Sequence, residues 1–99
     1  MFLYNKSMNN NTVGILKSLA DDTRLALVRQ LIAQNCEVAS SQIIVGCSEV
    51  LKLSQPTLSH HFSRLVQSGV LLDRKSGTEK YYQVNYELLR SIGIDPSKL

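Results

Sequence analysis

Six hydrogen-bonding side chains gather within ten residues in the second half of the chain. A glutamine can pair with adenine through two hydrogen bonds, and serine or threonine can reach base edges or phosphates. Short side chains also let a helix backbone approach its partner closely. These residues could therefore contact DNA, although a solvated polar face would have the same composition. The six residues are Gln55, Thr57, Ser59, His60, Ser63 and Arg64.

Basic side chains form a second cluster further along the chain. Arg74, Lys75 and Lys80 flank a predicted turn, and the acidic residues Asp73 and Glu79 lie among them. The local excess is therefore a single positive charge. Contact with DNA phosphates and a role in solubility or edge protection are both open for each of these basic residues.

The sequence contains two cysteines, Cys36 and Cys47. A disulfide between them would join the end of one predicted helix to the next and tilt the candidate DNA-reading helix. Such a bond requires Cα atoms within about 7 Å. Free cysteines are more often small buried apolar residues, and Cys47 lies on an apolar stripe. A thiol switch therefore remains an alternative.

The adjacent histidines His60 and His61 look like metal ligands until helical geometry is considered. Neighbours on a helix point about 100° apart, whereas two ligands from one helix need a spacing of three or four residues. We expect His60 on the polar face and His61 at the core margin. The sequence also lacks a nucleophile with a paired base and a glycine-rich phosphate loop. We therefore predict no metal site, no cofactor and no enzymatic activity.

Residues 55–68 have the pattern of one amphipathic helix. Ser54 is a favourable N-cap, Pro56 lies in the first turn, and Gly69 is a typical left-handed C-cap. The opposite face is apolar and is expected to pack on the core. Its residues are Leu58, Phe62, Leu65 and Val66.

The segments around this helix predict the remaining elements. "VLLDRK" and "KYYQVNY" alternate like strands and are separated by "SGTE", which predicts a β-hairpin. Helical periodicity predicts further helices at residues 12–20, 22–34, 43–51 and 87–94, with Thr12 and Asp22 as N-caps. "NCEVASSQ" is expected to be a polar connector. A mainly α chain with this order and a two-stranded wing is typical of a winged helix-turn-helix fold.

The 99 residues carry a net charge of +3 and a pI near 9.0, which favours an anionic partner without requiring one. We expect one DNA-binding and dimerisation domain over residues 12–95, preceded by a flexible segment over residues 1–11 in which Met8 could be the true start. Neither a secretory signal nor a membrane span is evident, so a cytoplasmic protein is expected. A chain this short has a modest core, which favours self-association.

Two segments, "LADDTRLALVRQLI" and "LSQPTLSHHFSRLVQSGVLLDRKSGTEKYYQV", resemble the arsenic-repressor (ArsR-type) family of bacterial winged-helix transcriptional repressors. The resemblance covers roughly residues 15–89. It implies a homodimer that binds a palindromic operator and releases it when an inducer binds. Gln55, Thr57, Ser59 and His60 would then be base-reading or positioning residues, and Arg74, Lys75 and Gly77 would lie on the wing. The residues that the resemblance assigns to the dimer seam are Leu16, Leu19, Leu88, Leu89 and Ile92.

The sequence departs from this family at its inducer sites. The three positions of the family's cysteine cluster fall on Ile43, Val45 and Ser48, and residues 85–99 contain no histidine for the family's other common metal site. A gap in the long connector could bring Cys47 into register with one sulfur. Neither standard metal site is present as written, so the resemblance leaves the inducer unidentified.

We therefore expect a sequence-specific transcriptional regulator, a homodimeric repressor whose partner is double-stranded operator DNA. One alternative is a winged-helix module for protein contact without sequence-specific DNA binding. The other is a repressor switched by Cys36 and Cys47. RNA binding has little support, because the sequence offers no evident aromatic surface on which bases could stack.

Overall fold

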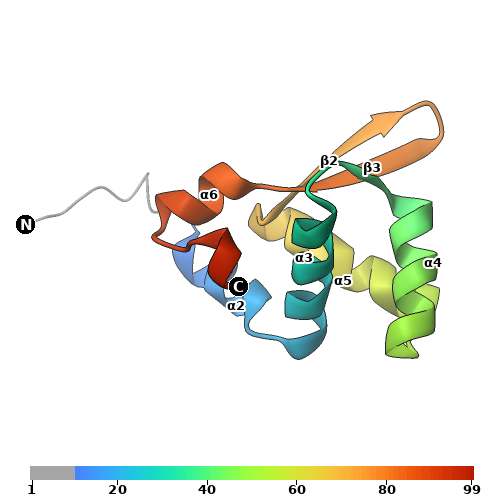
Figure 1. The fold of residues 1–99 in the computed structure, drawn as a ribbon, viewed down its shortest axis with the longest axis horizontal. Coiled ribbons are helices and arrows are strands. Elements are labelled where there is room, and N and C mark those ends of the chain that lie inside the picture. The colour runs from blue at the N-terminus through green and yellow to red at the C-terminus, as the bar shows by residue number, and fades with distance from the viewer. Residues whose placement is uncertain (1–10) are drawn as a thin grey trace, which may run out of the picture.

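The computed structural model describes residues 11–99 and shows five α-helices with a three-stranded antiparallel sheet (Figure 1). The predicted class, mainly α with a β-hairpin wing, is confirmed. Of the predicted flexible segment only Asn11 is described, and Met8 lies outside the described residues. The helices are α2 (Thr12–Leu19), α3 (Asp22–Gln34), α4 (Ser40–Leu51), α5 (Gln55–Ser68) and α6 (Tyr86–Ser91), followed by the 3-10 turn η1 (Pro96–Lys98). The strands are β1 (Val38–Ala39), β2 (Leu71–Ser76) and β3 (Glu79–Val84).

Both predicted caps at the start of the chain are displaced by one residue. Asp21, rather than Asp22, caps α3, because its backbone is extended and its carboxylate accepts a hydrogen bond from the N–H of Arg24 at 2.9 Å. Asp22 lies inside the first turn, where its negative charge still suits the helix dipole. Thr12 is likewise the first residue of α2, and Asn11 takes the cap position.

Helices α4 and α5 form the predicted helix-turn-helix. Lys52 ends α4 in the left-handed conformation, with φ of 58°, and the backbone N–H of Thr57 donates to the Ser54 hydroxyl that caps α5. Gly69 ends α5 with φ of 90°, as the sequence predicts. Helix α4 begins at Ser40, three residues before the predicted start at Ile43. The apolar periodicity missed this first turn because Ser40, Ser41 and Gln42 are polar.

The segment before α4 was predicted to be a polar connector, and it contains the short strand β1. Val38 pairs with Tyr82 and Ala39 with Tyr81, which places β3 in the middle of the sheet order β1-β3-β2. The turn of the hairpin is also tighter than predicted, since Ser76 pairs with Glu79 and only two residues remain between the strands. The hairpin projects from the helical body (Figure 1).

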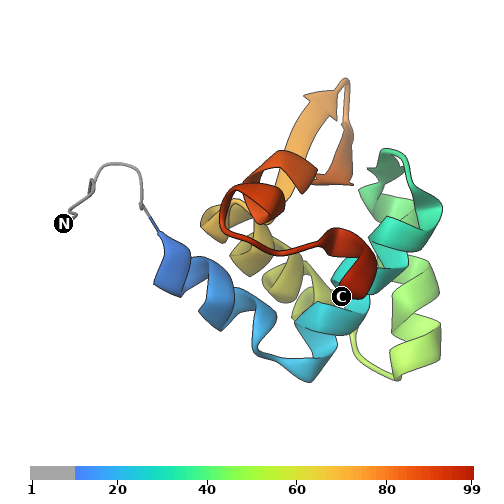
Figure 2. The same cartoon turned by 60° about the vertical axis from the view of Figure 1, so that its left-hand side comes forward.

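The core is built around α5, which crosses the middle of the molecule between α2 and α4 (Figure 2). Phe62 is fully buried and stacks on Tyr82 of β3, with ring centroids 4.7 Å apart and planes within 6°. This contact fixes the hairpin to the helix. No helix among residues 11–99 has the length and apolar character needed to cross a bilayer.

The C-terminal helix is shorter than the predicted range of residues 87–94. Asn85 caps α6 by accepting from the N–H of Leu88, while its side-chain amide donates to the carbonyl of Gly69 at 3.0 Å. The helix ends at Ser91 because the chain turns at Gly93, where φ is 87°. The fold extends beyond the predicted limit at residue 95, since Pro96 is buried and Leu99 packs against the core.

Candidate nucleic-acid interface

Helix α5 presents its polar residues to solvent along one face. Its apolar side chains Leu58, Phe62 and Leu65 have 0% exposure, which fixes the rotation of the helix about its own axis. The side chains of Gln55, Ser59, His60, Ser63 and Arg64 are exposed and make no hydrogen bond or ion pair with other residues in the described part of the chain. Thr57 differs, because its hydroxyl accepts from Ser54 at 2.8 Å and supports the helix start.

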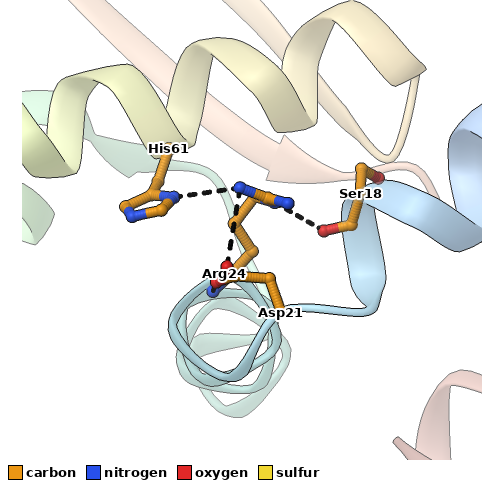
Figure 3. Close-up of polar contacts among 4 residues, drawn as sticks. All are labelled: Ser18, Asp21, Arg24 and His61. Atoms are coloured by element: carbon orange, nitrogen blue, oxygen red, sulfur yellow. Dashed lines mark hydrogen bonds and ion pairs between the residues drawn. The ribbon is translucent and has the colours of Figure 1, made fainter.

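The two adjacent histidines divide between surface and interior as predicted. His60 is exposed, and its ring lies in a T-shaped arrangement with that of His61, with centroids 6.2 Å apart, whereas His61 turns inwards towards Arg24. Because a guanidinium can only donate, Nδ1 of His61 accepts from Nη1 of Arg24 at 3.2 Å. Arg24 Nε also donates to the carbonyl of Ser18 at 2.7 Å. The Arg24 side chain therefore joins α2, α3 and α5 (Figure 3).

Two of the basic residues on the wing are engaged with acidic residues. Nε and Nη2 of Arg74 donate to the two carboxylate oxygens of Glu37 at 2.6 and 2.8 Å, and the guanidinium lies 4.9 Å from the centre of the Tyr81 ring. This hydrogen bonding holds the pKa of Glu37 below its ordinary value and raises the pKa of Arg74. Lys80 lies 3.8 Å from Asp73.

The wing tip has residues that, unlike Arg74 and Lys80, do not contact acidic side chains in the described part of the chain. Lys75 is exposed and forms no ion pair in the described part of the chain. Gly77 has φ of 65°, a conformation that the tight turn requires and that side chains rarely adopt. Lys75 and Gly77 are therefore the wing residues most open to a phosphate backbone.

Sequence reasoning missed the contacts that two acidic residues make at this surface. Glu37 orients Arg74 from the connector, and Glu79 accepts hydrogen bonds from Ser40 and Ser41, which ties the wing to the start of α4. The hydrogen bond from Ser41 is the main reason that the pKa of Glu79 is lowered. The available signal for the Glu37 contact was its position next to Val38 and Ala39, but the strand β1 that these two residues form was not predicted.

The residues expected at the dimer seam differ in exposure within one chain. Leu16 is 50% exposed, and the nearby Val13, which was not predicted, is 65% exposed. Leu88 and Ile92 are partly buried. Leu19 and Leu89 pack inside the protomer, with 8% and 0% exposure, so their side chains have little surface left to offer a partner.

The two cysteines lie in different surroundings. Cys36 is exposed after the end of α3, whereas Cys47 is buried in the wall of a cleft of about 580 Å3 between α3 and α4. Burial raises the pKa of the Cys47 thiol, which disfavours the reactive thiolate. Both thiols are free. Among residues 11–99, no three His, Cys, Asp or Glu side chains gather where they could hold a metal ion.

Comparison with known proteins identifies the family to which this arrangement belongs. The model of the family described as "bacterial regulatory protein, arsR family" matches residues 21–71, which run from the cap of α3 to the start of the wing. The chain belongs to the arsR family. The family consists of bacterial regulatory proteins, and its curated relatives are transcriptional regulators and repressors.

Curated relatives agree with this assignment. The arsenic resistance transcriptional regulator ArsR1 of Pseudomonas putida is 38% identical over 74 residues, which are 75% of this chain and 54% of that protein. The arsenical resistance operon repressor of Staphylococcus aureus is 37% identical over 79 residues, covering 79% of this chain and 69% of that protein. This chain thus spans about half of the first relative and somewhat over two thirds of the second.

A solved structure agrees with the fold. The homodimeric winged helix-turn-helix DNA-binding domain from Mycobacterium bovis matches with a TM-score of 0.68 and 21% identity, over 93% of this chain and 82% of that one. The family and the winged helix-turn-helix fold expected from the sequence are both confirmed for this arsR-family protein.

Proposed function

We propose that this arsR-family protein is a homodimeric repressor that reads an operator with α5 and holds the flanking backbone with the wing. The observation that carries this proposal is the exposed polar face of α5, where Gln55, Ser59, His60 and Ser63 have no hydrogen-bond partner among residues 11–99, while the opposite face is buried. A helix anchored in this way can enter a major groove without losing contacts of its own.

The roles within this interface follow from the exposure and partners of each side chain. Gln55, Ser59, His60 and Ser63 would face the bases, since all four are exposed and have no hydrogen-bond partner in the described part of the chain. Thr57 would act by supporting the helix start through Ser54. Lys75, with the backbone at Gly77, would contact phosphate. Arg74 and Lys80 would shape the wing through their acidic partners.

A homodimer is supported by the exposed apolar residues of α2 and by relatives of the family. Leu16 and Val13 are large, apolar and at least half exposed, which is costly for a surface that stays in water. The structurally similar domain from Mycobacterium bovis is homodimeric. Two copies would place their α5 helices about one turn of DNA apart, which matches a palindromic operator. The inducer, if this protein has one, is not specified by any standard metal site of the family.

The decisive experiment is a fluorescence anisotropy titration with DNA from upstream of the protein's own gene, in the presence of excess unrelated competitor. Ser59→Ala combined with His60→Ala should remove discrimination between operator and competitor, because a lost base contact costs about 1–3 kcal/mol. Circular dichroism should show an unchanged fold, since both residues are exposed. Normal discrimination by the variant would contradict the role of α5. Wild-type binding that disappears under competitor would instead favour a module for protein contact.

A further inference from the structure

A hollow of about 250 Å3 lies between α2 and the C-terminal half of α5, apart from the bases that α5 would read. Three of its lining residues are cations, Lys17, Arg24 and Arg64, and none is acidic. The rest of the lining is neutral and includes Ser18 and Ser68, whose hydroxyls already donate to the carbonyls of Ile15 and Leu65. A small concave site lined by three cationic side chains and no carboxylate suits an anion.

The positive charge in this hollow is poorly compensated by the protein itself. Lys17 and Arg64 are exposed and form no ion pair with any of residues 11–99. The Arg24 side chain is only 12% exposed, and its ion-pair partner Asp21 lies 3.9 Å away. That carboxylate is also occupied by the backbone N–H of Arg24. Three cationic side chains therefore line one hollow, and the ion pair among them in the described part of the chain is the one between Arg24 and Asp21.

The guanidinium of Arg24 is held in place by its other contacts. Nε donates to the Ser18 carbonyl and Nη1 to His61, so α2 and α5 fix its position before any ligand arrives (Figure 3). A cation whose geometry is fixed in advance loses little entropy when it binds an oxyanion. Lys17 and Arg64, on flexible exposed side chains, can close on the same group from either side.

We propose that Lys17, Arg24 and Arg64 form a binding site for a phosphate-type oxyanion in the hollow between α2 and α5. The group can be a phosphate of the DNA backbone beside α5, or it can belong to a free phosphate compound. Binding of a DNA phosphate rests on the proposed function, whereas binding of a free phosphate compound does not. In either case Arg64 binds phosphate instead of reading bases, and the bound anion links the expected dimer helix to the DNA-reading helix.

The first test uses inorganic phosphate without DNA, measured by calorimetric titration and by the thermal unfolding midpoint against sodium chloride at equal ionic strength. Lys17→Gln combined with Arg64→Gln should weaken phosphate binding by about tenfold or more, because each charged hydrogen bond contributes more than a neutral one. Lys98→Gln removes one exposed charge outside the hollow and should bind phosphate as the wild type does. Circular dichroism checks that all variants fold.

The second test measures DNA affinity against salt concentration for the same variants. If a backbone phosphate occupies the hollow, the double variant lowers the slope of log affinity against log salt by about 0.9 per protomer, whereas Lys98→Gln leaves it unchanged. If the double variant loses phosphate binding but keeps the wild-type salt slope, the ligand of the hollow is a free phosphate compound. If the double variant has a lowered salt slope and the wild type does not bind free phosphate, the ligand of the hollow is a phosphate of the DNA backbone.

The proposal is overturned if the double variant binds phosphate as the wild type does and also keeps the wild-type slope of DNA affinity against salt. A wild-type protein that fails to bind DNA at all would contradict the proposed function alone. In that case the phosphate titration still decides the site by itself.

Discussion

At the scale of single residues, Arg24 and its neighbours determine where α5 sits relative to the first two helices. Arg24 contacts the end of α2 at Ser18, the cap of α3 at Asp21 and the inner histidine of α5, His61. None of these side chains would contact DNA bases. They hold the base-facing helix in place, and their loss should therefore affect stability and DNA binding together.

Asp21 offers a direct test of this corner through its cap and its charge. Asp21→Ala should lower the free energy of unfolding by about 1 kcal/mol, because the N–H of Arg24 loses its acceptor. Asp21→Asn keeps an oxygen acceptor but removes the charge. Urea denaturation monitored by circular dichroism measures both variants.

The effect of the Asp21 charge depends on pH in a defined direction. The hydrogen bond from the Arg24 N–H and the charge of Arg24 hold the pKa of Asp21 below its ordinary value, against an opposing effect of burial. The ionised form is therefore favoured in the folded state, and its stabilisation is present above about pH 4 and lost as the pH falls further. The stability difference between wild type and Asp21→Asn should narrow below that pH. A difference that widens there would contradict this account.

The cysteines provide a second test at the residue scale. Iodoacetamide should modify exposed Cys36 in the native protein at least about tenfold faster than buried Cys47, whose thiolate is disfavoured by its raised pKa. Mass spectrometry of the modified protein measures the two rates, and Cys36→Ser is the matched control. Formation of a bond between Cys36 and Cys47 in native protein treated with diamide would instead restore the thiol switch as a mechanism.

At the scale of elements, the wing and α5 are joined through aromatic packing. Phe62 and Tyr82 stack in the core, so the hairpin is attached to the helix whose opposite face is exposed. Strand β1 and the contacts of Glu79 with Ser40 and Ser41 attach the same hairpin to α4. The wing is therefore positioned by both helices of the helix-turn-helix.

Substitutions in the aromatic pair should separate ring packing from the tyrosine hydroxyl. Phe62→Leu should lower the free energy of unfolding by about 1–3 kcal/mol, because it loses the ring stack and leaves a cavity. Tyr82→Phe keeps both rings and should change it by less than about 0.5 kcal/mol. Chemical denaturation measures both values. Equal losses in the two variants would show that the hydroxyl, and not the stack, attaches the wing.

At the scale of the whole molecule, one chain leaves apolar surface on α2 that its own core does not cover. Leu16 and Val13 provide this surface, while Leu19 and Leu89 have been taken into the protomer core. The charged hollow lies along the same helix, through Lys17. Dimerisation and anion binding would thus involve neighbouring faces of α2.

A charge placed on the apolar face of α2 should separate the protomers. Leu16→Glu should raise the dimer dissociation constant by about a hundredfold or more, because a carboxylate would be buried without a partner. Val50→Glu is the matched control, since Val50 is 78% exposed on α4, far from α2 in Figure 1. Sedimentation velocity measures both. A variant with glutamate at position 16 that remains dimeric would place the seam elsewhere.

The sequence alone determined the helix-turn-helix and the wing because these elements depend on local signals. Ser54 and Gly69 limit α5 as predicted, and the period of Leu58, Phe62 and Leu65 fixed which face is buried. The polar face of α5, and with it the candidate DNA-reading residues, followed from the same periodicity. Motif spacing was enough to indicate the family.

Tertiary structure decided the features that depend on residues distant in sequence. Strand β1 is too short to have a period of its own and exists because β3 supplies hydrogen-bonding partners. The sequence left phosphate contact and a solubility role both open for Arg74, and only folding brings Glu37 to its guanidinium. The hollow of Lys17, Arg24 and Arg64 forms only where α2 packs on α5. The local sequence pattern specifies the secondary structure of each segment, whereas tertiary packing specifies which charged side chains lie close together.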